Sequence, residues 1–223
     1  MPVIWNYNPD WNIFFKLPYK FKLVPEILNL YEYFLSKHLF TGTLHEEKEI
    51  LSRIIDPASM EIGFNQLFVA YQQSLYWHIR KMVIDHNDTD DILQEVFIKV
   101  WKNIDKFRED SNLFTWLYKI ATNECLNFLK RRKDKYKVSM EDANKELFSK
   151  LDNSPHISGS AIQKKLQKAL LTLPDKQRLV FNMKYFEDMK YEDISKITET
   201  SVGSLKASYH IAVKKIEEYI KLD

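Results

Sequence analysis

The sequence contains a single cysteine, Cys125, and only four glycines among its 223 residues. One cysteine cannot form an intramolecular disulfide, so the chain predicts a protein of the reducing cytoplasm. The few glycines form neither a P-loop nor a dinucleotide-binding fingerprint. The six histidines are scattered, contain no HExxH pair and have no second cysteine with which to make a zinc site. The sequence therefore predicts no metal, no cofactor and no small-molecule substrate, and it gives an enzyme interpretation almost no support.

The sequence also lacks an apolar run of the ~20 residues needed to span a bilayer, and the charge order at its start is wrong for a signal peptide. Its net charge is only +2, with 33 Lys and Arg against 31 Asp and Glu. Overall charge therefore does not indicate nucleic-acid binding, and any such binding must come from local clusters. With 45% hydrophobic residues, the chain can bury one or two modest cores.

Helical periodicity dominates the sequence from Glu46 onward. It predicts helices at residues 46–55, 62–84, 90–104, 113–133, 175–186, 191–197 and 202–220. Between the fourth and fifth helices, the polar stretch 134–159 predicts a linker with one short helix near 142–151. The helices thus form two groups joined by a linker.

The first 45 residues are rich in aromatic side chains, are broken by four prolines and contain one helical pattern at residues 25–40. Their aromatic content favours burial and argues against simple disorder. Three interpretations are open: an extra helix packed on the following domain, a segment that contacts a membrane or a regulator, or upstream sequence translated from a misassigned start. The pattern favours the last two.

The predicted helix at 90–104, with Asp88 or Thr89 as its cap, combines an apolar face with an acidic one. Apolar residues recur at helical spacing from Ile92 to Ile104 and predict the buried face, which includes Trp101. The opposite face carries Asp91, Gln94, Glu95 and Ile98. A single exposed isoleucine usually has no function, but an acidic face with an apolar centre is also a suitable partner site. Both interpretations stay open from the residues alone.

The predicted helix at 113–133 combines an aromatic ring, amides and cations on one outward side. These residues are Trp116, Lys119, Asn123, Asn127 and Lys130. They suit nucleobases and phosphates, and six of the eight residues at 130–137 are Lys or Arg. An ordinary solvated face and a solubilising helix end explain the same pattern equally well. Glu124 falls near the middle of the apolar side of this helix, and pairing with a neighbouring Lys or Arg is the one explanation that the pattern offers.

The last two predicted helices, joined by a short turn, indicate a helix-turn-helix. Ser201 is placed to cap the final helix, and a stripe from Leu205 to Ile216 predicts its buried side. The outward side carries Gly203, Lys206, Ala207, His210, Ile211 and Lys214. Small residues near the helix start allow close approach to a major groove, and lysines can reach phosphate or guanine. A plain three-helix hairpin is the alternative.

Four segments, in order, resemble a known family: DDILQEVFIKVW, FREDSNLFTWLYKIATNECLNFLKRR, LPDKQRLVFNMKYFEDMKYEDIS and SVGSLKASYHIAVKKI. The chain resembles RNA polymerase sigma factors of the extracytoplasmic-function (ECF) group of the sigma-70 family, over about residues 46–219. The resemblance implies an all-α fold with two small helical domains joined by a flexible linker. The implied division is an N-terminal extension (1–45), sigma domain 2 (46–133), a linker (134–160) and sigma domain 4 with the helix-turn-helix (161–223).

The resemblance also implies roles for individual residues. The residues that bind the clamp of core RNA polymerase are expected to be Asp91, Gln94, Glu95 and Ile98. Those that open and bind the downstream promoter box (the −10 element) are expected to be Arg108, Ser111, Asn112, Thr115, Trp116, Lys119, Asn123, Asn127, Lys130 and Arg131. Those that bind the upstream box (the −35 element) are expected to be Ser201, Gly203, Ser204, Lys206, Ala207, His210 and Lys214. The implied partners are core RNA polymerase, promoter DNA and an anti-sigma factor, and catalysis belongs to the polymerase.

The sequence departs from the family pattern at two places. Many members have glycine in the turn before the recognition helix, where this chain has Glu199; positive φ there costs a non-glycine residue on the order of 1 kcal/mol. Ala207, His210 and Ile211 occupy positions where arginine is frequent, so upstream contacts are expected to be weaker and more apolar.

Two other functions compete with the sigma interpretation. A free-standing helix-turn-helix regulator would bind a palindromic operator as a dimer, but the sequence shows no dimer seam. A protein adaptor would use only the acidic face at 91–98, which leaves the basic segments without a role.

Overall fold

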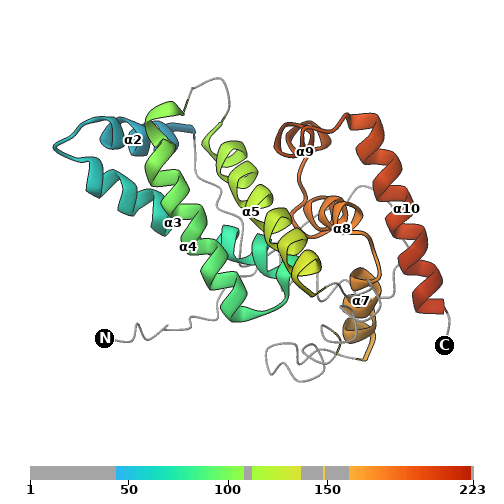
Figure 1. Cartoon of the computed structure of the whole chain (residues 1–223). Coiled ribbons are helices and arrows are strands. Elements are labelled where there is room, and N and C mark those ends of the chain that lie inside the picture. Colours follow the sequence, from blue (N-terminus) through green and yellow to red (C-terminus); the bar gives the residue numbers. More distant parts are fainter. Residues whose placement is uncertain (1–43, 108–111, 137–147, 149–160, 222–223) are drawn as a thin grey trace.

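The computed structural model describes residues 44–107, 112–136, 148 and 161–221. All regular elements among these residues are helical, and none is a strand, so the predicted all-α class is confirmed. The helices form two groups, α2 to α5 and α7 to α10, that lie side by side (Figure 1). The predicted helix at 142–151, apart from Phe148, and the one at 25–40 lie outside the described residues.

The first group contains α2 (Leu44–Ile55), α3 (Met60–Val83), α4 (His86–Asn103) and α5 (Leu113–Tyr136), with a single 3-10 turn at Ile104–Lys106. Helix α4 begins one turn earlier than predicted. The cap is Asp85, whose carboxylate accepts a hydrogen bond from the Asp88 backbone N–H at 3.1 Å. A capping carboxylate at the first turn satisfies an otherwise unpaired amide, which explains the earlier start.

The second group contains α7 (Ala161–Leu171), α8 (Asp175–Phe181), α9 (Tyr191–Thr198) and α10 (Val202–Lys221). The sequence predicted one continuous helix at 175–186, but its second half, Asn182–Phe186, is a π-helix. The wider turn ends with the Glu187 N–H bonded to the Asn182 carbonyl at 3.2 Å. The π-turn therefore determines where the Glu187 side chain emerges, and such insertions often mark functional positions.

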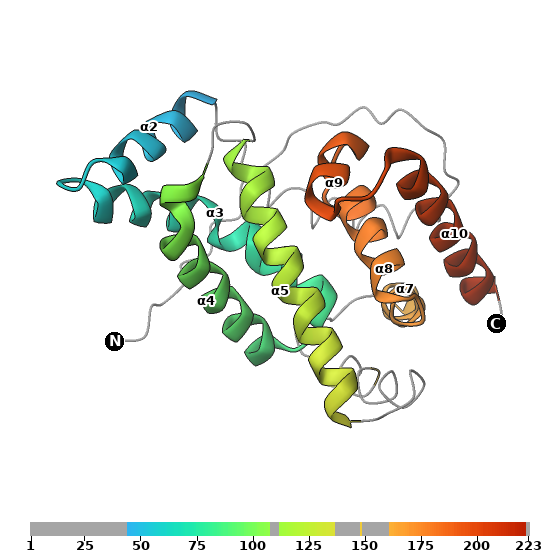
Figure 2. The ribbon, with the colours of Figure 1, turned by 45° about the horizontal axis from the view of Figure 1, so that its top comes forward.

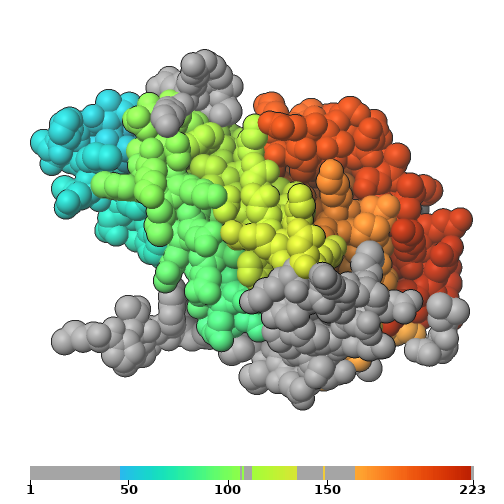
Figure 3. Space-filling view, viewed as in Figure 1, coloured from blue at the N-terminus to red at the C-terminus, as the bar shows by residue number. Residues whose placement is uncertain are grey.

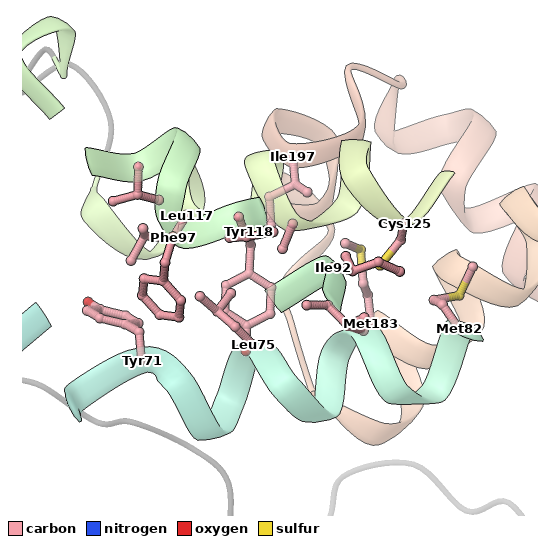
Figure 4. Packing of buried hydrophobic residues seen from close by; sticks show 14 of the residues in the cluster. Tyr71, Leu75, Met82, Ile92, Phe97, Leu117, Tyr118, Cys125, Met183 and Ile197 are labelled. Atoms are coloured by element: carbon pink, nitrogen blue, oxygen red, sulfur yellow. The ribbon is translucent and has the colours of Figure 1, made fainter. Parts of the chain in front are cut away.

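One hydrophobic core joins the two groups. Tyr71, Leu75 and Met82 of α3 line it from below in Figure 4, where Met183 and Ile197 of the second group reach into the same cluster. Met183 is fully buried and Ile197 is 1% exposed. A second, smaller core lies within the C-terminal group, between α7, α8 and α10. The two groups thus pack as one body in this structure.

Cys125 lies in the shared core and is fully buried. Burial raises the pKa of its thiol well above the ordinary value, so the residue is a packed, protonated side chain at neutral pH.

Candidate polymerase and DNA interfaces

The outward face of α4 is accessible as predicted. Asp91, Gln94 and Glu95 are exposed, and Ile98 is 52% exposed. Trp101, which the sequence placed on the buried face, is 40% exposed and rests edge-on against Phe64 at 4.7 Å between ring centroids. The apolar centre of this face therefore contains two residues about one turn apart, Ile98 and Trp101. Helical spacing alone did not predict that Trp101 is exposed, because this residue lies at the edge of the apolar stripe.

An open hollow of about 330 Å³ lies where α4 and α5 pack side by side (Figure 2). The side chains that line it are Lys99, Asn103, Trp116, Ile120, Asn123 and Glu124. Trp116 and Asn123 were predicted from the sequence as base contacts, and the structure brings them to one cavity. The hollow combines an aromatic wall with amide donors and acceptors and is of a size that suits a single nucleobase.

Glu124 forms one side of this hollow and is only 8% exposed at its side chain. Lys99 of α4 approaches its carboxylate at 2.5 Å and is a neighbouring cation of the kind that the sequence offered as its partner. A charge buried in this way persists only when it is paired. The ion pair joins α4 to α5 at the hollow and leaves the amides of Asn103 and Asn123 beside it.

The other predicted downstream-box residues fall into three sets. Asn123, Asn127, Lys130 and Arg131 are exposed along α5. Thr115 is 5% exposed, and its backbone N–H donates to the Asn112 side chain at 2.7 Å, so these two residues form the start of α5. Arg108 and Ser111 lie outside the described residues. The DNA roles of all these residues stay predictions.

Lys119 has a partner that the sequence did not reveal. Its Nζ lies 2.6 Å from Glu199 Oε1, across the boundary between the two groups. Glu199 adopts the left-handed conformation, with φ 53° and ψ 35°, so the turn does place a non-glycine residue at positive φ. The hydrogen bond and charge of Lys119 lower the pKa of the Glu199 carboxyl. In this structure Glu199, in the turn before α10, is therefore paired with Lys119, one of the cations that were predicted to bind the downstream box.

The predicted upstream-box face of α10 is exposed. Ser201 caps the helix, since its hydroxyl accepts from the Ser204 N–H at 3.3 Å. Gly203, Ser204, Lys206, Ala207, His210 and Lys214 are all exposed, and Ile211 is 45% exposed. A Cβ added at Gly203 would meet no atom within 4 Å. Packing within the chain therefore does not require glycine at this position. This agrees with the prediction that a DNA major groove approaches the helix closely from outside.

Glu187 links the two groups through a buried cluster of charges. Its carboxylate lies 3.1 Å from His78 Nδ1 and 3.1 Å from Lys81 Nζ, both on α3. Burial by itself would raise the pKa of the Glu187 carboxyl, but the charges and hydrogen bonds of Lys81 and His78 lower it to about 2. His78 Nε2 in turn lies 3.0 Å from Thr122 Oγ1 on α5. One carboxylate of the second group is thus bound to α3 and is linked to α5 through His78.

This cluster predicts a specific loss of stability in acid. The pKa of Glu187 falls from 4.5 to about 2 on folding, so the ion pair stabilises the packed form fully above about pH 4.5 and is lost as the pH falls towards 2. The shift corresponds to about 3 kcal/mol. We expect the urea midpoint of the wild type to exceed that of Glu187→Gln at pH 6 and the difference to shrink below pH 4.5. A difference that is constant from pH 6 to pH 3 contradicts the assignment.

Together, two helical groups and an exposed helix-turn-helix are typical of a DNA-binding protein. Residues 67–135 match the family model of Sigma-70 region 2, and residues 163–216 match that of Sigma-70, region 4. The chain belongs to the ECF group of sigma-70 family RNA polymerase sigma factors. Members of this family direct core RNA polymerase to specific promoters, and promoter-specific transcription initiation is the function of this chain.

Several curated relatives are similar along most of their length. The chain is 30% identical to the ECF RNA polymerase sigma-E factor of Haemophilus influenzae over 167 residues, which are 71% of this chain and 88% of the relative. It is 29% identical to the ECF sigma factor SigW of Bacillus subtilis, over 66% and 83% of the two chains. It is 28% identical to the RNA polymerase sigma-H factor of Pseudomonas aeruginosa, over 80% and 96%.

Two solved structures share the fold. The sigma factor RpoE in complex with the anti-sigma factor NepR, from Bartonella quintana, superposes with a TM-score of 0.56 at 24% identity, over 72% of this chain and 98% of that one. CnrH in complex with the cytosolic domain of CnrY superposes with a TM-score of 0.57 at 19% identity, over 80% and 99%. Among the described residues, every helix is too short or too polar to cross a membrane.

Proposed function

We propose that the α4 face of Asp91, Gln94, Glu95 and Ile98, extended by Trp101, binds core RNA polymerase in the cytoplasm, where the polymerase performs all the catalysis. Its acidic rim and apolar centre resemble a protein interface, in which charges surround a desolvated core. The exposed pair Ile98 and Trp101 carries this assignment, because together they form an apolar centre within an acidic helix face. The proposed domains are residues 46–133 and 161–223, with 134–160 as the linker and 1–45 as an extension.

The downstream box is proposed to bind along α5, from the hollow to the basic end of the helix. A nucleobase leaving the stack costs a few kcal/mol, which stacking on Trp116 and hydrogen bonds to Asn123 can offset. Asn127, Lys130 and Arg131 follow on the same helix and are exposed. The cations would hold the phosphate backbone, whereas the hollow would select the base.

The upstream box is proposed to bind α10 through the face that begins at Ser201. We expect the double substitution of Lys206 and Lys214 by Ala to weaken use of promoters that depend on the upstream box by roughly tenfold, since each lost phosphate or base contact costs about 1 kcal/mol or less at physiological salt. Core polymerase binding should hardly change. Run-off transcription on promoters with and without the upstream box separates the two effects, and equal losses on both promoters contradict the role.

We propose that the packed arrangement does not contact both boxes at once. The −35 and −10 elements lie roughly 25 base pairs, or about 85 Å, apart along B-DNA. In this structure α9 packs directly on α5, and Lys119 is bound to Glu199. We therefore propose that the two groups separate when the chain binds polymerase and promoter, and that the packed form is the one held by an anti-sigma factor.

The function is tested by run-off transcription with purified core polymerase from the source organism on a pool of genomic promoter fragments. Discrete new transcripts that require this chain establish the proposed activity, and alignment of their start sites yields the promoter. Binding to DNA as a dimer without core polymerase, and without transcripts, would support the free-standing regulator instead.

A further inference from the structure

Between residues 62 and 73, over about three turns, the outward face of α3 carries no charged side chain, and the exposed Glu61 lies at its N-terminal end. From residue 62 to residue 73 its exposed side chains are Ile62, Asn65, Val69 and Gln73. Ile62 and Val69 are 58% and 61% exposed, and because they are seven residues apart they lie on one line of the helix. The centres of protein interfaces are depleted in charge in this way, whereas solvated helix faces are not.

The neighbouring α2 shows the contrast. Its exposed residues near the start include Glu46, Lys48 and Glu49, as expected of a helix face in water. Helix α2 packs against the start of α3, and this part of the chain lies at the left edge of the molecule in Figure 3. The absence of charge is therefore a property of the α3 face and not of this whole side of the protein.

An unpaired polar atom lies on the same side of α3. The Gln66 side chain sits between Ile62 and Val69 along the helix, and its Oε1 is buried without a hydrogen-bond donor among the described residues. A buried amide oxygen that lacks a donor is destabilising. The face therefore combines exposed apolar side chains with a buried acceptor that still requires a donor.

Residues 1–43 have the composition that such a face would bind. They contain 11 of the chain's 31 aromatic residues and only four lysines against three acidic residues. Aromatic side chains contribute large apolar areas and are enriched where proteins bind one another. At residues 25–40, the pattern of Leu28, Tyr31, Leu35 and Leu39 recurs at helical spacing and predicts an apolar stripe.

The segment joins the described structure at α2, which packs on the side of α3 away from the uncharged face. Tyr71 Oη donates to Glu47 Oε1 at 2.6 Å, which places the first turn of α2 beside the middle of α3. Val69 points to the other side of the helix from Tyr71, and a helix is about 10–12 Å across, so the 43 residues before Leu44 are long enough to pass around α3 and reach it. A tethered segment has an effective concentration on the order of millimolar, so modest contacts are enough to hold it.

We propose that the uncharged α3 face, formed by Ile62, Asn65, Gln66, Val69 and Gln73, is the intramolecular docking surface for residues 1–43. The aromatic segment covers Ile62 and Val69, and a donor from it satisfies Gln66. The segment thus belongs to the folded body of the first group.

Limited trypsin proteolysis of the full chain tests the proposal, with cleavage after Lys16, Lys20, Lys22 and Lys37 followed by mass spectrometry. Val69→Glu should accelerate cleavage at these sites about tenfold, because burying a valine contributes roughly 1.5 kcal/mol. The matched control is Ile98→Glu, which introduces the same charge at an isoleucine of similar exposure on another helix. It should leave the cleavage rates at their wild-type values.

A substitution on the other partner completes the test. Leu35→Glu in the segment should accelerate cleavage as Val69→Glu does, and the double variant should be no faster than either, because both remove the same contact. Unchanged thermal unfolding would show that Val69→Glu leaves the helices intact. Equal cleavage of wild type, Val69→Glu and Ile98→Glu overturns the proposal. Protection from trypsin that increases with protein concentration, together with a doubled mass in light scattering, also overturns the proposal, because the face then binds a second copy of the chain.

Discussion

Glu187→Gln should open the packed arrangement of the two groups. Removing the negative charge leaves Lys81, only 12% exposed at its side chain, without the carboxylate that lies 3.1 Å away. Removing one partner of a buried ion pair typically lowers the free energy of unfolding by about 3–5 kcal/mol. We expect a larger radius of gyration in small-angle X-ray scattering. Because binding would no longer compete with the packed form, the affinity for core polymerase should rise by about tenfold to a hundredfold.

The control for this substitution is Glu192→Gln, which makes the same change at an exposed carboxylate in the first turn of α9. It should alter neither the radius of gyration nor the affinity for core polymerase, since an exposed first-turn charge contributes only a few tenths of a kcal/mol. An unchanged or weaker affinity of Glu187→Gln, in a chain that has expanded, would refute competition between packing and polymerase binding. An unchanged radius would show that the apolar contacts of the shared core hold the groups without the ion pair.

Ile98→Arg should abolish binding to core polymerase without changing helix content. A cation at the centre of the proposed interface would have to be buried without a partner, and central interface residues often cost 2 kcal/mol or more when altered. We expect the dissociation constant to rise at least roughly thirtyfold, measured by fluorescence anisotropy with labelled protein and core enzyme. Circular dichroism should be unchanged because the side chain is 52% exposed.

Ile55→Arg provides the matched control, because Ile55 at the end of α2 is 76% exposed and lies outside the proposed interface. Its affinity for core polymerase should equal that of the wild type. If Ile98→Arg also binds normally, the α4 face is not the polymerase interface. If both variants lose binding equally, the effect comes from added positive charge and not from the position.

Several features of the site could be predicted from local pattern. The exposed α4 face, the cap at Ser201 and the outward side of α10 all follow from a period of 3.6 residues and from the end-capping of helices, which act over a few neighbouring residues. The proposed base contacts Trp116 and Asn123 could be predicted to share a side of one helix. Lys99 and Asn103 of α4 complete the hollow because of the way α4 packs on α5. The spacing of residues within one helix does not specify that packing.

By itself, the sequence determined the helical class, the approximate positions of the helices and the residue types on each exposed face, because these depend on local periodicity and charge. Only the tertiary structure decided that the two groups share a core, that Lys119 pairs with Glu199 and that Thr115 is buried while Trp101 is accessible. His78 and Glu187 are 109 residues apart in the chain. Their contact arises from the packing of whole helices and from a π-turn, and no sequence interval of a few residues encodes it.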